Sequence, residues 1–80
     1  MKTVKVGMIQ MEVLFCQPKQ NLAKAAELVK KAVDAGAQIC VIPECMDLGW
    51  GTPGAAELAE PIPGRISDEL CRIAKDNQVY

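Results

Sequence analysis

The sequence predicts an α/β fold in which strand, helix, strand and helix follow one another, and three observations support this prediction. Residues 4–11 and 39–42 are short runs with apolar side chains on both faces, which is typical of interior strands of a parallel sheet. Between them, residues 18–35 repeat apolar side chains at the spacing of one helix face. Two strands joined by a helix within about forty residues form a βαβ unit, so we expect the strands to be parallel.

The first predicted strand runs from Val4 to Met11. Its apolar side chains at positions 6, 8, 9 and 11 fall on both faces, so we expect a strand in the interior of a sheet. Gly7 lies in the middle of this strand. Because glycine has no side chain, it leaves room for another element to pack closely over the strand.

The first predicted helix runs from Pro18 to about Ala35. Proline suits the first helical position, where its missing N–H has no partner to lose, and Gly36 is a natural stop. We expect Glu27 and Lys31 to form an ion pair one turn apart. The apolar face of this helix is made of Leu22, Ala25, Ala26, Val29, Ala32 and Val33.

The second predicted strand is the apolar run Ile39–Ile42, which ends at Pro43. A long connection from Glu44 to Pro63 follows, with glycine at 49, 51 and 54 and proline at 53, 61 and 63. A connection of this length in a compact domain is usually functional or disordered.

The second predicted helix runs from about Ser67 to Asp76, and Val79–Tyr80 is the expected start of a third strand. The apolar face of this helix is made of Ile66, Leu70, Ile73 and Ala74. Two helices cover only one face of the sheet, although the strands are apolar on both faces, and a bare apolar face is an aggregation hazard. We therefore interpret residues 1–80 as the N-terminal part of one larger α/β domain, truncated at the start of the third strand.

Composition and charge exclude several function classes. The net charge is −1 with interspersed signs, so neither a nucleic-acid surface nor a membrane anchor is expected. The first residues do not form a signal peptide and no apolar run is long enough to span a membrane, so we expect a soluble, cytoplasmic protein. No glycine-rich phosphate loop is present, and no cofactor is predicted.

The cysteines favour neither a metal site nor disulfide bonds. No pair has the C-x-x-C spacing, and the chain has no histidine. Cys40 and Cys71 have apolar neighbours and are expected to be small core residues. Cys16, just before the first helix, is also expected to be structural.

Glu44 is the candidate catalytic residue. In parallel α/β sheets, ligands bind beyond the carboxyl ends of the strands, and the second strand delivers Glu44 to that edge. Pro43 restricts the backbone of this stem. A carboxylate where a buried strand meets a long loop is expected to be partly shielded from water, which suits a proton acceptor. The alternative is a solvated loop acid or a cap on a neighbouring helix.

Three other side chains, two close to Glu44 in sequence and one before the second helix, leave alternatives open. Cys45 could be a nucleophile beside its base, but adjacent residues leaving a strand point in different directions, so a packing role is favoured. Trp50 either lines a substrate pocket or covers the core with its ring. Arg65 is expected to be solvated or paired.

The run Val41–Glu44, then four residues, then Gly49 and Trp50, resembles the first signature of the nitrilase, or carbon–nitrogen hydrolase, superfamily. Four further features resemble that superfamily in the same order along the chain. They are the strand end Ile9–Met11 with its glutamine, Asn21 in the first helical turn, Ala35–Ala37 before the second strand, and Ala59–Gly64 before the second helix. Residues 70–80 also resemble the helix and strand entrance that follow, so the resemblance covers essentially the whole chain.

This resemblance implies an α-β-β-α sandwich and a Glu–Lys–Cys active site acting on amide, carbamoyl or nitrile carbon–nitrogen bonds. By its position in the motif, Glu44 would be the general base. The lysine would stabilise an oxyanion and the cysteine would attack the substrate carbon. Neither of their motifs occurs in these residues, so the isolated chain is expected to be inactive. The resemblance also implies a small-molecule substrate and, for the full-length form, a homo-oligomer.

A small non-catalytic α/β binding or interaction module is the alternative function. Its support is the complete βαβ unit with its second helix, which could fold alone or by self-association.

Overall fold

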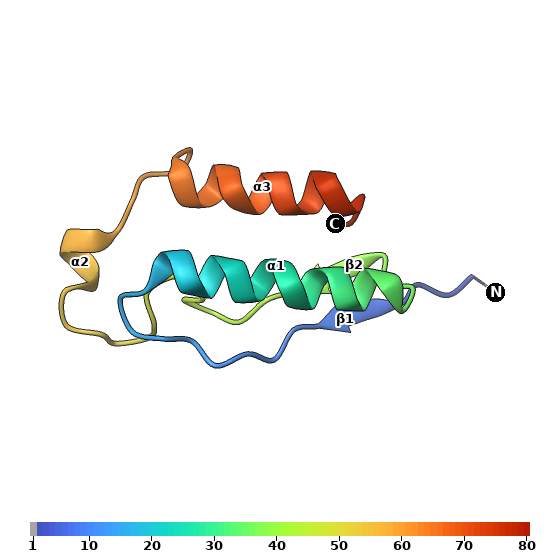
Figure 1. Cartoon of the computed structure of the whole chain (residues 1–80), viewed down its shortest axis with the longest axis horizontal. Helices are drawn as coiled ribbons and strands as arrows, with labels where there is room; N and C mark the ends of the chain where they lie inside the picture. The colour runs from blue at the N-terminus through green and yellow to red at the C-terminus, as the bar shows by residue number, and fades with distance from the viewer. Residues whose placement is uncertain (1) are drawn as a thin grey trace.

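The computed structural model describes residues 2–80, so only Met1 of the predicted domain 1–80 lies outside the described residues. In chain order, the elements are β1 (Val6–Met8), α1 (Pro18–Asp34), β2 (Ile39–Val41), α2 (Ala55–Leu58) and α3 (Arg65–Asn77). The two long helices run in the same direction along the molecule, and the strands run the opposite way (Figure 1). The predicted α/β class is confirmed, with a parallel two-stranded sheet.

Strands β1 and β2 pair in parallel, with Val6 opposite Ile39 and Met8 opposite Val41. These four side chains share one face of the sheet because side chains alternate along a strand. That face is open, since Met8 is 77% exposed and Val41 is 53% exposed. The expectation of a bare apolar face is therefore confirmed for the part of the chain that the structure describes.

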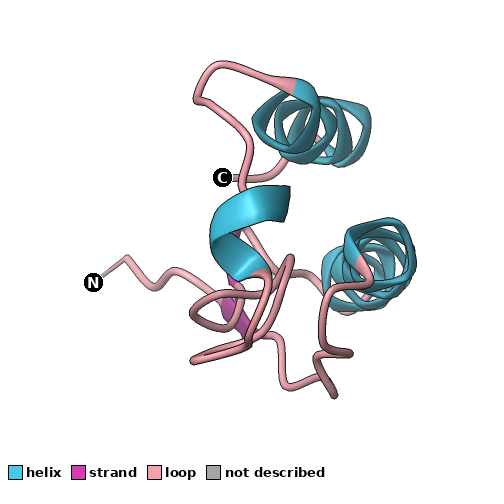
Figure 2. Ribbon diagram, turned by 90° about the vertical axis from the view of Figure 1, so that its left-hand side faces the viewer, coloured by secondary structure: helices cyan, strands magenta, loops and turns pink. Residues whose placement is uncertain are grey.

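The other face of the sheet is covered by the helices, which lie together on one side of the strands when viewed end on (Figure 2). A core cluster joins Ile9, Val29, Ile73 and Val79 from these layers. Helix α1 packs closely on β1, because a Cβ atom added to Gly7 would come within 2.8 Å of the Cβ of Ala32. The predicted close approach over Gly7 is confirmed.

Strand β1 is shorter than the predicted Val4–Met11, because only residues opposite β2 form a ladder. Pairing continues just beyond both ends of the assigned strands. The Gln38 N–H donates to the Lys5 carbonyl at 2.8 Å, and the Ile9 N–H donates to the Val41 carbonyl at 2.9 Å.

The helix boundaries follow local hydrogen bonding. Helix α1 ends one residue before the predicted end, and Gly36 adopts a left-handed φ of 101° as expected of a stop. Helix α3 begins two residues before the predicted Ser67. The Ser67 hydroxyl accepts from the Gly64 N–H at 2.9 Å, which makes Ser67 the third helical residue rather than the first.

Two predictions about individual side chains are wrong. Glu27 pairs with Lys24 at 3.2 Å and not with Lys31, because residues three apart on a helix are also neighbours. Cys71 is exposed rather than in the core. It lies next to Leu70, and one residue on a helix turns the side chain by about 100° away from the apolar face.

The end of the chain lies alongside β2. The Tyr80 N–H donates to the Gln38 carbonyl at 3.1 Å, and the Tyr80 carbonyl accepts from the Cys40 N–H at 2.7 Å. Tyr80 thus bonds to two residues of the neighbouring strand that are two positions apart, Gln38 and Cys40. This is the hydrogen-bond pattern of parallel strands. Val79–Tyr80 therefore has the hydrogen bonds of a third parallel neighbour, as predicted, on the side of β2 away from β1.

No helix within residues 2–80 is both long enough and apolar enough to cross a lipid bilayer.

Candidate functional site

The candidate site lies at the carboxyl ends of β1 and β2. A cavity of about 370 Å³ opens there, lined by residues 8–11 after β1 and residues 41–43 after β2. Glu44 directly follows Pro43, which forms part of the lining. The structure therefore places the predicted base where ligands of parallel sheets bind.

Glu44 begins a compact turn, residues 44–49, which we call the tied turn. The Gly49 N–H donates to the Cys45 carbonyl at 2.9 Å and closes it. Met46 and Leu48 are each 5% exposed, so the turn is anchored in the core by its own apolar side chains. This anchoring was not predicted, although apolar residues alternate there around Asp47.

Asn21 connects the tied turn to the loop that follows β1. Its side chain is 1% exposed. The carbonyl Oδ1 accepts from the Leu14 N–H at 2.9 Å, and Nδ2 donates to the carbonyls of Leu14 and Asp47, both at 2.8 Å. The Cys16 N–H adds a fourth link by donating to the Leu48 carbonyl at 2.9 Å.

Gly49 ends the tied turn, and both its backbone conformation and its surroundings require glycine. Its φ is 92°, a left-handed value that other residues adopt only with strain. A Cβ atom at this position would lie 2.5 Å from Cδ1 of Phe15. Glycine is therefore required both by the backbone conformation and by the ring packed over it.

Glu44 itself is exposed in the described chain, so the expected partial shielding is not found there. The physical reason is that its neighbours Met46 and Leu48 point into the core, whereas nothing in residues 2–80 covers the open face of the sheet beside it. Within residues 2–80, the exposure of Glu44 agrees with the alternative of a solvated loop acid. The alternative of a helix cap receives no support, because no hydrogen bond joins Glu44 to a helix within these residues.

The thiols near the site do not form a nucleophile–base pair. Cys45 is exposed and has no hydrogen bond to Glu44 within the described chain. Cys40 is half-buried, and burial raises the pKa of its thiol, which disfavours the reactive thiolate. The Cys16 thiol faces the Pro53 carbonyl at 3.7 Å. The environment of Cys16 favours its predicted structural role, whereas the exposure of Cys45 does not support the packing role predicted for it.

Trp50 is 74% exposed. The alternative in which its ring covers the core is therefore wrong for the described chain, where Met46 and Leu48 of the preceding turn are the buried side chains. The other alternative, a wall of a substrate pocket, stays a prediction.

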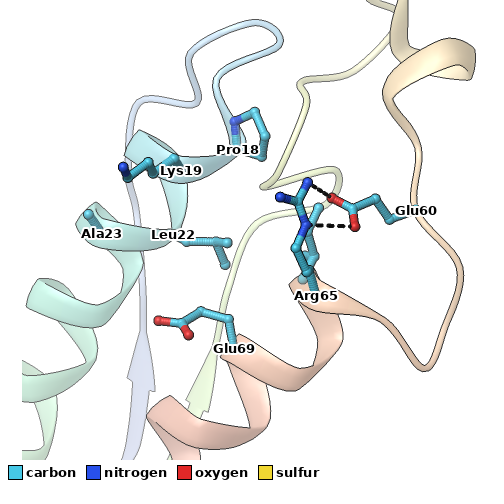
Figure 3. A pocket seen from close by; sticks show the side chains of 8 residues that line it. Pro18, Lys19, Leu22, Ala23, Glu60, Arg65 and Glu69 are labelled. Carbon is cyan, nitrogen blue, oxygen red and sulfur yellow. Dashed lines mark hydrogen bonds and ion pairs between the residues drawn. The ribbon is translucent and has the colours of Figure 1, made fainter.

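A second cavity, of about 510 Å³, lies between the N-terminal ends of α1 and α3 (Figure 3). Leu22 from α1 and Glu69 from α3 both line it. At its rim, Arg65 donates Nε to one oxygen of Glu60 at 3.1 Å and Nη2 to the other at 2.7 Å. This pair confirms that Arg65 is paired, and it lowers the pKa of Glu60 through the Arg65 hydrogen bonds.

No three cysteine, aspartate or glutamate side chains among residues 2–80 lie close enough together to share a metal ion. The expectation that the protein uses neither a metal nor a cofactor stays a prediction.

The site is thus a carboxylate on an anchored turn at the ligand-binding edge of a parallel α/β sheet. Comparison with known proteins then identifies the family. The chain matches the carbon-nitrogen hydrolase family over residues 5–80. This 80-residue chain therefore belongs to the carbon–nitrogen hydrolase family, as the resemblance to nitrilases predicted.

Individual relatives agree with the family match. The chain is 35% identical to mouse Omega-amidase NIT2 over 80 residues, which is 100% of this chain and 29% of that protein. It is 43% identical to Omega-amidase NIT2-B of Xenopus laevis over 60 residues, 75% of this chain and 22% of that protein. A Nitrilase of Pyrococcus abyssi is 37% identical over 81 residues, 96% of this chain and 31% of that protein. The chain spans less than a third of the length of these curated relatives.

Proposed function

We propose that residues 1–80 are the N-terminal part of a single carbon–nitrogen hydrolase domain in which Glu44 is the general base. The observation that carries this proposal is the placement of Glu44. It follows β2 at the carboxyl edge of the sheet, on a turn held by buried side chains, in a chain of this family. A general base must be held in position, and an anchored turn does so more rigidly than a free loop.

The proposed chemistry divides into two half-reactions. Glu44 takes the proton of a cysteine thiol, and the thiolate attacks the substrate carbon. A lysine stabilises the oxyanion that forms, and the proton passes to the nitrogen that leaves. Glu44 then takes a proton from water, which attacks the thioester and releases the acid and the thiol. The lysine and the cysteine would come from outside these residues, since none of the cysteines stands in the nucleophile's motif.

An amide is the substrate class we favour, with carbamoyl compounds and nitriles as the other candidates. The names of the mouse and Xenopus relatives contain amidase, and that of the Pyrococcus abyssi relative is nitrilase. The cavity beside Glu44 is lined mainly by apolar side chains together with Gln10, which suits a small molecule rather than a polymer.

The family membership also bears on the open face of the sheet. We propose that a second sheet covers Val6, Met8, Ile39 and Val41, which would complete the α-β-β-α sandwich. The apolar character of this face supports the proposal, because large exposed apolar patches mark interfaces. Assembly of the complete protein into a homo-oligomer and a cytoplasmic location are further proposals. The isolated chain would be inactive because it holds the base without the nucleophile.

The proposal is tested on the complete protein that contains this chain, with a panel of small amides, carbamoyl amines and nitriles. We expect hydrolysis of at least one amide and a covalent acyl-enzyme detectable by mass spectrometry. Glu44→Gln should lower kcat by about 10²–10⁴-fold, which is the usual contribution of a general base. Glu57→Gln, at another exposed glutamate of the same connection, is the matched control and should leave kcat unchanged. Full activity in Glu44→Gln would refute the proposed role.

A further inference from the structure

Asn21 is the one polar side chain that is buried within residues 2–80, and all of its hydrogen bonds go to backbone groups of other segments. The bonding pattern fixes the orientation of the amide. The Leu14 N–H can only meet the carbonyl oxygen, and the carbonyls of Leu14 and Asp47 can only meet the NH₂ group. Asn21 therefore uses both donors and one acceptor to hold two loops together.

This use of Asn21 is not explained by the needs of its own helix. Polar side chains near a helix start usually bond to the free backbone N–H groups of the first turn. Helix α1 has no such cap, since the side chain of Gln17 makes no capping hydrogen bond. Although α1 lacks a side-chain cap, the Asn21 amide is directed away from the helix backbone to Leu14 and Asp47.

The bond to Asp47 acts on the stretch that carries Glu44. Asp47 lies three residues after Glu44, inside the turn closed by the Gly49 N–H and the Cys45 carbonyl. The bonds to Leu14 hold the other loop of the same sheet edge, which the Cys16 N–H joins to Leu48. Both loops are bonded to the same buried amide, and that amide is fixed on a helix. A displacement of the amide would therefore displace both loops at this edge of the sheet.

We propose that Asn21 is a positioning residue for Glu44: it holds the tied turn at the height above the sheet edge at which the carboxylate meets its proton donor. This inference rests on the proposed function, because the position of Glu44 matters only if Glu44 is the base. Displacement of a reacting group by about 1 Å lowers rates by about 10²-fold. Loss of Asn21 should therefore act on the chemical step more than on substrate binding.

The test compares kcat and KM of the complete protein with those of Asn21→Asp and Asn21→Ser, using the best amide of the panel. Asn21→Asp keeps an oxygen for the Leu14 N–H but loses both donated bonds, and Asn21→Ser can keep only one of the bonds. For both variants we expect kcat per folded molecule to fall by about 10–100-fold, while KM changes by less than about 3-fold. The folded fraction is measured by near-ultraviolet circular dichroism.

Asn77→Asp and Asn77→Ser are matched controls. Asn77 also donates from Nδ2 to a backbone carbonyl, that of Ile73 at 2.9 Å, but at the end of α3 remote from Glu44. These controls should keep both kcat and KM. Asn21→Ser is the milder change because it introduces no charge. If Asn21→Asp does not fold, the kinetics of Asn21→Ser decide the test.

Three results would overturn the inference. Wild-type kcat in a folded Asn21→Ser variant would show that the turn keeps its position without the amide. An equal fall in the Asn77 variants would show a general effect on the fold. Failure of both Asn21 variants to fold would make Asn21 a folding residue and not a positioning one. An inactive wild-type protein would instead refute the proposed function itself, whereas activity lost in Glu44→Gln and kept in Asn21→Ser would refute this inference alone.

Discussion

The connection between β2 and α3 consists of two halves that are held in different ways. The tied turn, residues 44–49, has two apolar side chains in the core and four backbone groups bonded to other segments or to one another. The remainder, residues 50–63, which we call the outer segment, has no buried side chain among its described residues. Trp50 and Ile62 are 74% and 87% exposed.

The difference shows that length alone does not determine how firmly a loop is held. A connection of this length was expected to be functional or disordered as one piece. Instead, its first residues are anchored by two buried side chains and by hydrogen bonds to other segments, and the proposed base lies at their beginning. The outer segment is held mainly by local order, such as the four-residue helix α2 and the ion pair of Glu60 with Arg65. Its one long-range hydrogen bond runs from the Cys16 thiol to the Pro53 carbonyl at 3.7 Å within the described residues.

The largest expected effect concerns the position of the carboxylate at the head of the tied turn. Glu44→Asp in the complete protein keeps the charge and withdraws it by one methylene, so we expect amide hydrolysis to fall by about 10²-fold with an unchanged Tm. Glu57→Asp, in the outer segment, should change neither. Steady-state kinetics and thermal unfolding of both variants measure the contrast. Equal activity in the two variants would show that the position of the Glu44 carboxylate has no special importance for hydrolysis.

The next effect concerns apolar anchoring. Met46→Ala in the complete protein should lower the free energy of unfolding by about 2–4 kcal/mol, because it empties a buried site. Trp50→Ala removes a larger side chain from an exposed position and should change it by less than about 0.5 kcal/mol. Urea unfolding gives both values. A large loss for Trp50→Ala would indicate that further residues of the complete protein cover the ring.

A pair of glycines separates backbone strain from steric clash. Both Gly49 and Gly51 have a left-handed φ, but a Cβ atom at Gly51 would meet nothing within 4 Å. Gly51→Ala should therefore destabilise the complete protein by about 1 kcal/mol, the cost of the left-handed conformation. Gly49→Ala should destabilise it by about 2–3 kcal/mol, since Phe15 must also move. Similar values for the two variants would mean that the ring moves aside without resistance.

The smallest effect comes from the ion pair at the end of the outer segment. Arg65 lowers the pKa of Glu60, so the pair stabilises the fold above the ordinary value near 4.5 and loses this effect as the pH falls through the lowered pKa. Glu60→Gln should lower Tm slightly at pH 7, by less than Gly51→Ala does. The difference from wild type should shrink steadily in thermal scans taken below pH 4.5. If the difference in Tm between Glu60→Gln and wild type stayed constant down to acid pH, the ion pair of Glu60 with Arg65 would not be its cause.

The periodic parts of this chain could be predicted from the sequence because helix and strand patterns are local. The apolar faces of α1 and α3, the close approach over Gly7 and the parallel pairing all follow from spacing. Glu44 was also identified locally, from a proline-braced strand end, and its catalytic role stays a prediction. The family match supports the resemblance that named this role.

The links between segments could not be predicted in the same way, because they depend on contacts between residues distant in the chain. Nothing near Asn21 indicates that its amide bonds to Asp47, and nothing near Gly49 indicates that Phe15 packs on it. The sequence also did not determine whether Glu27 pairs with Lys24 or with Lys31, since both lie about one helical turn from it. The exposure of Glu44 depends on what covers the open sheet face, which local pattern does not reveal.

The contact between Tyr80 and β2 has a consequence for the motion of the strand that carries Glu44. With β1 bonded on one side and Tyr80 on the other, β2 is flanked on both sides by backbone partners. A strand bonded on both sides opens only when the sheet itself separates, so its amide hydrogens exchange with solvent more slowly than those of an edge strand. The Cys40 amide, bonded to Tyr80 at 2.7 Å, should be among the slowest to exchange. We therefore expect the turn that begins with Glu44, the proposed base, to follow the least mobile strand of this sheet.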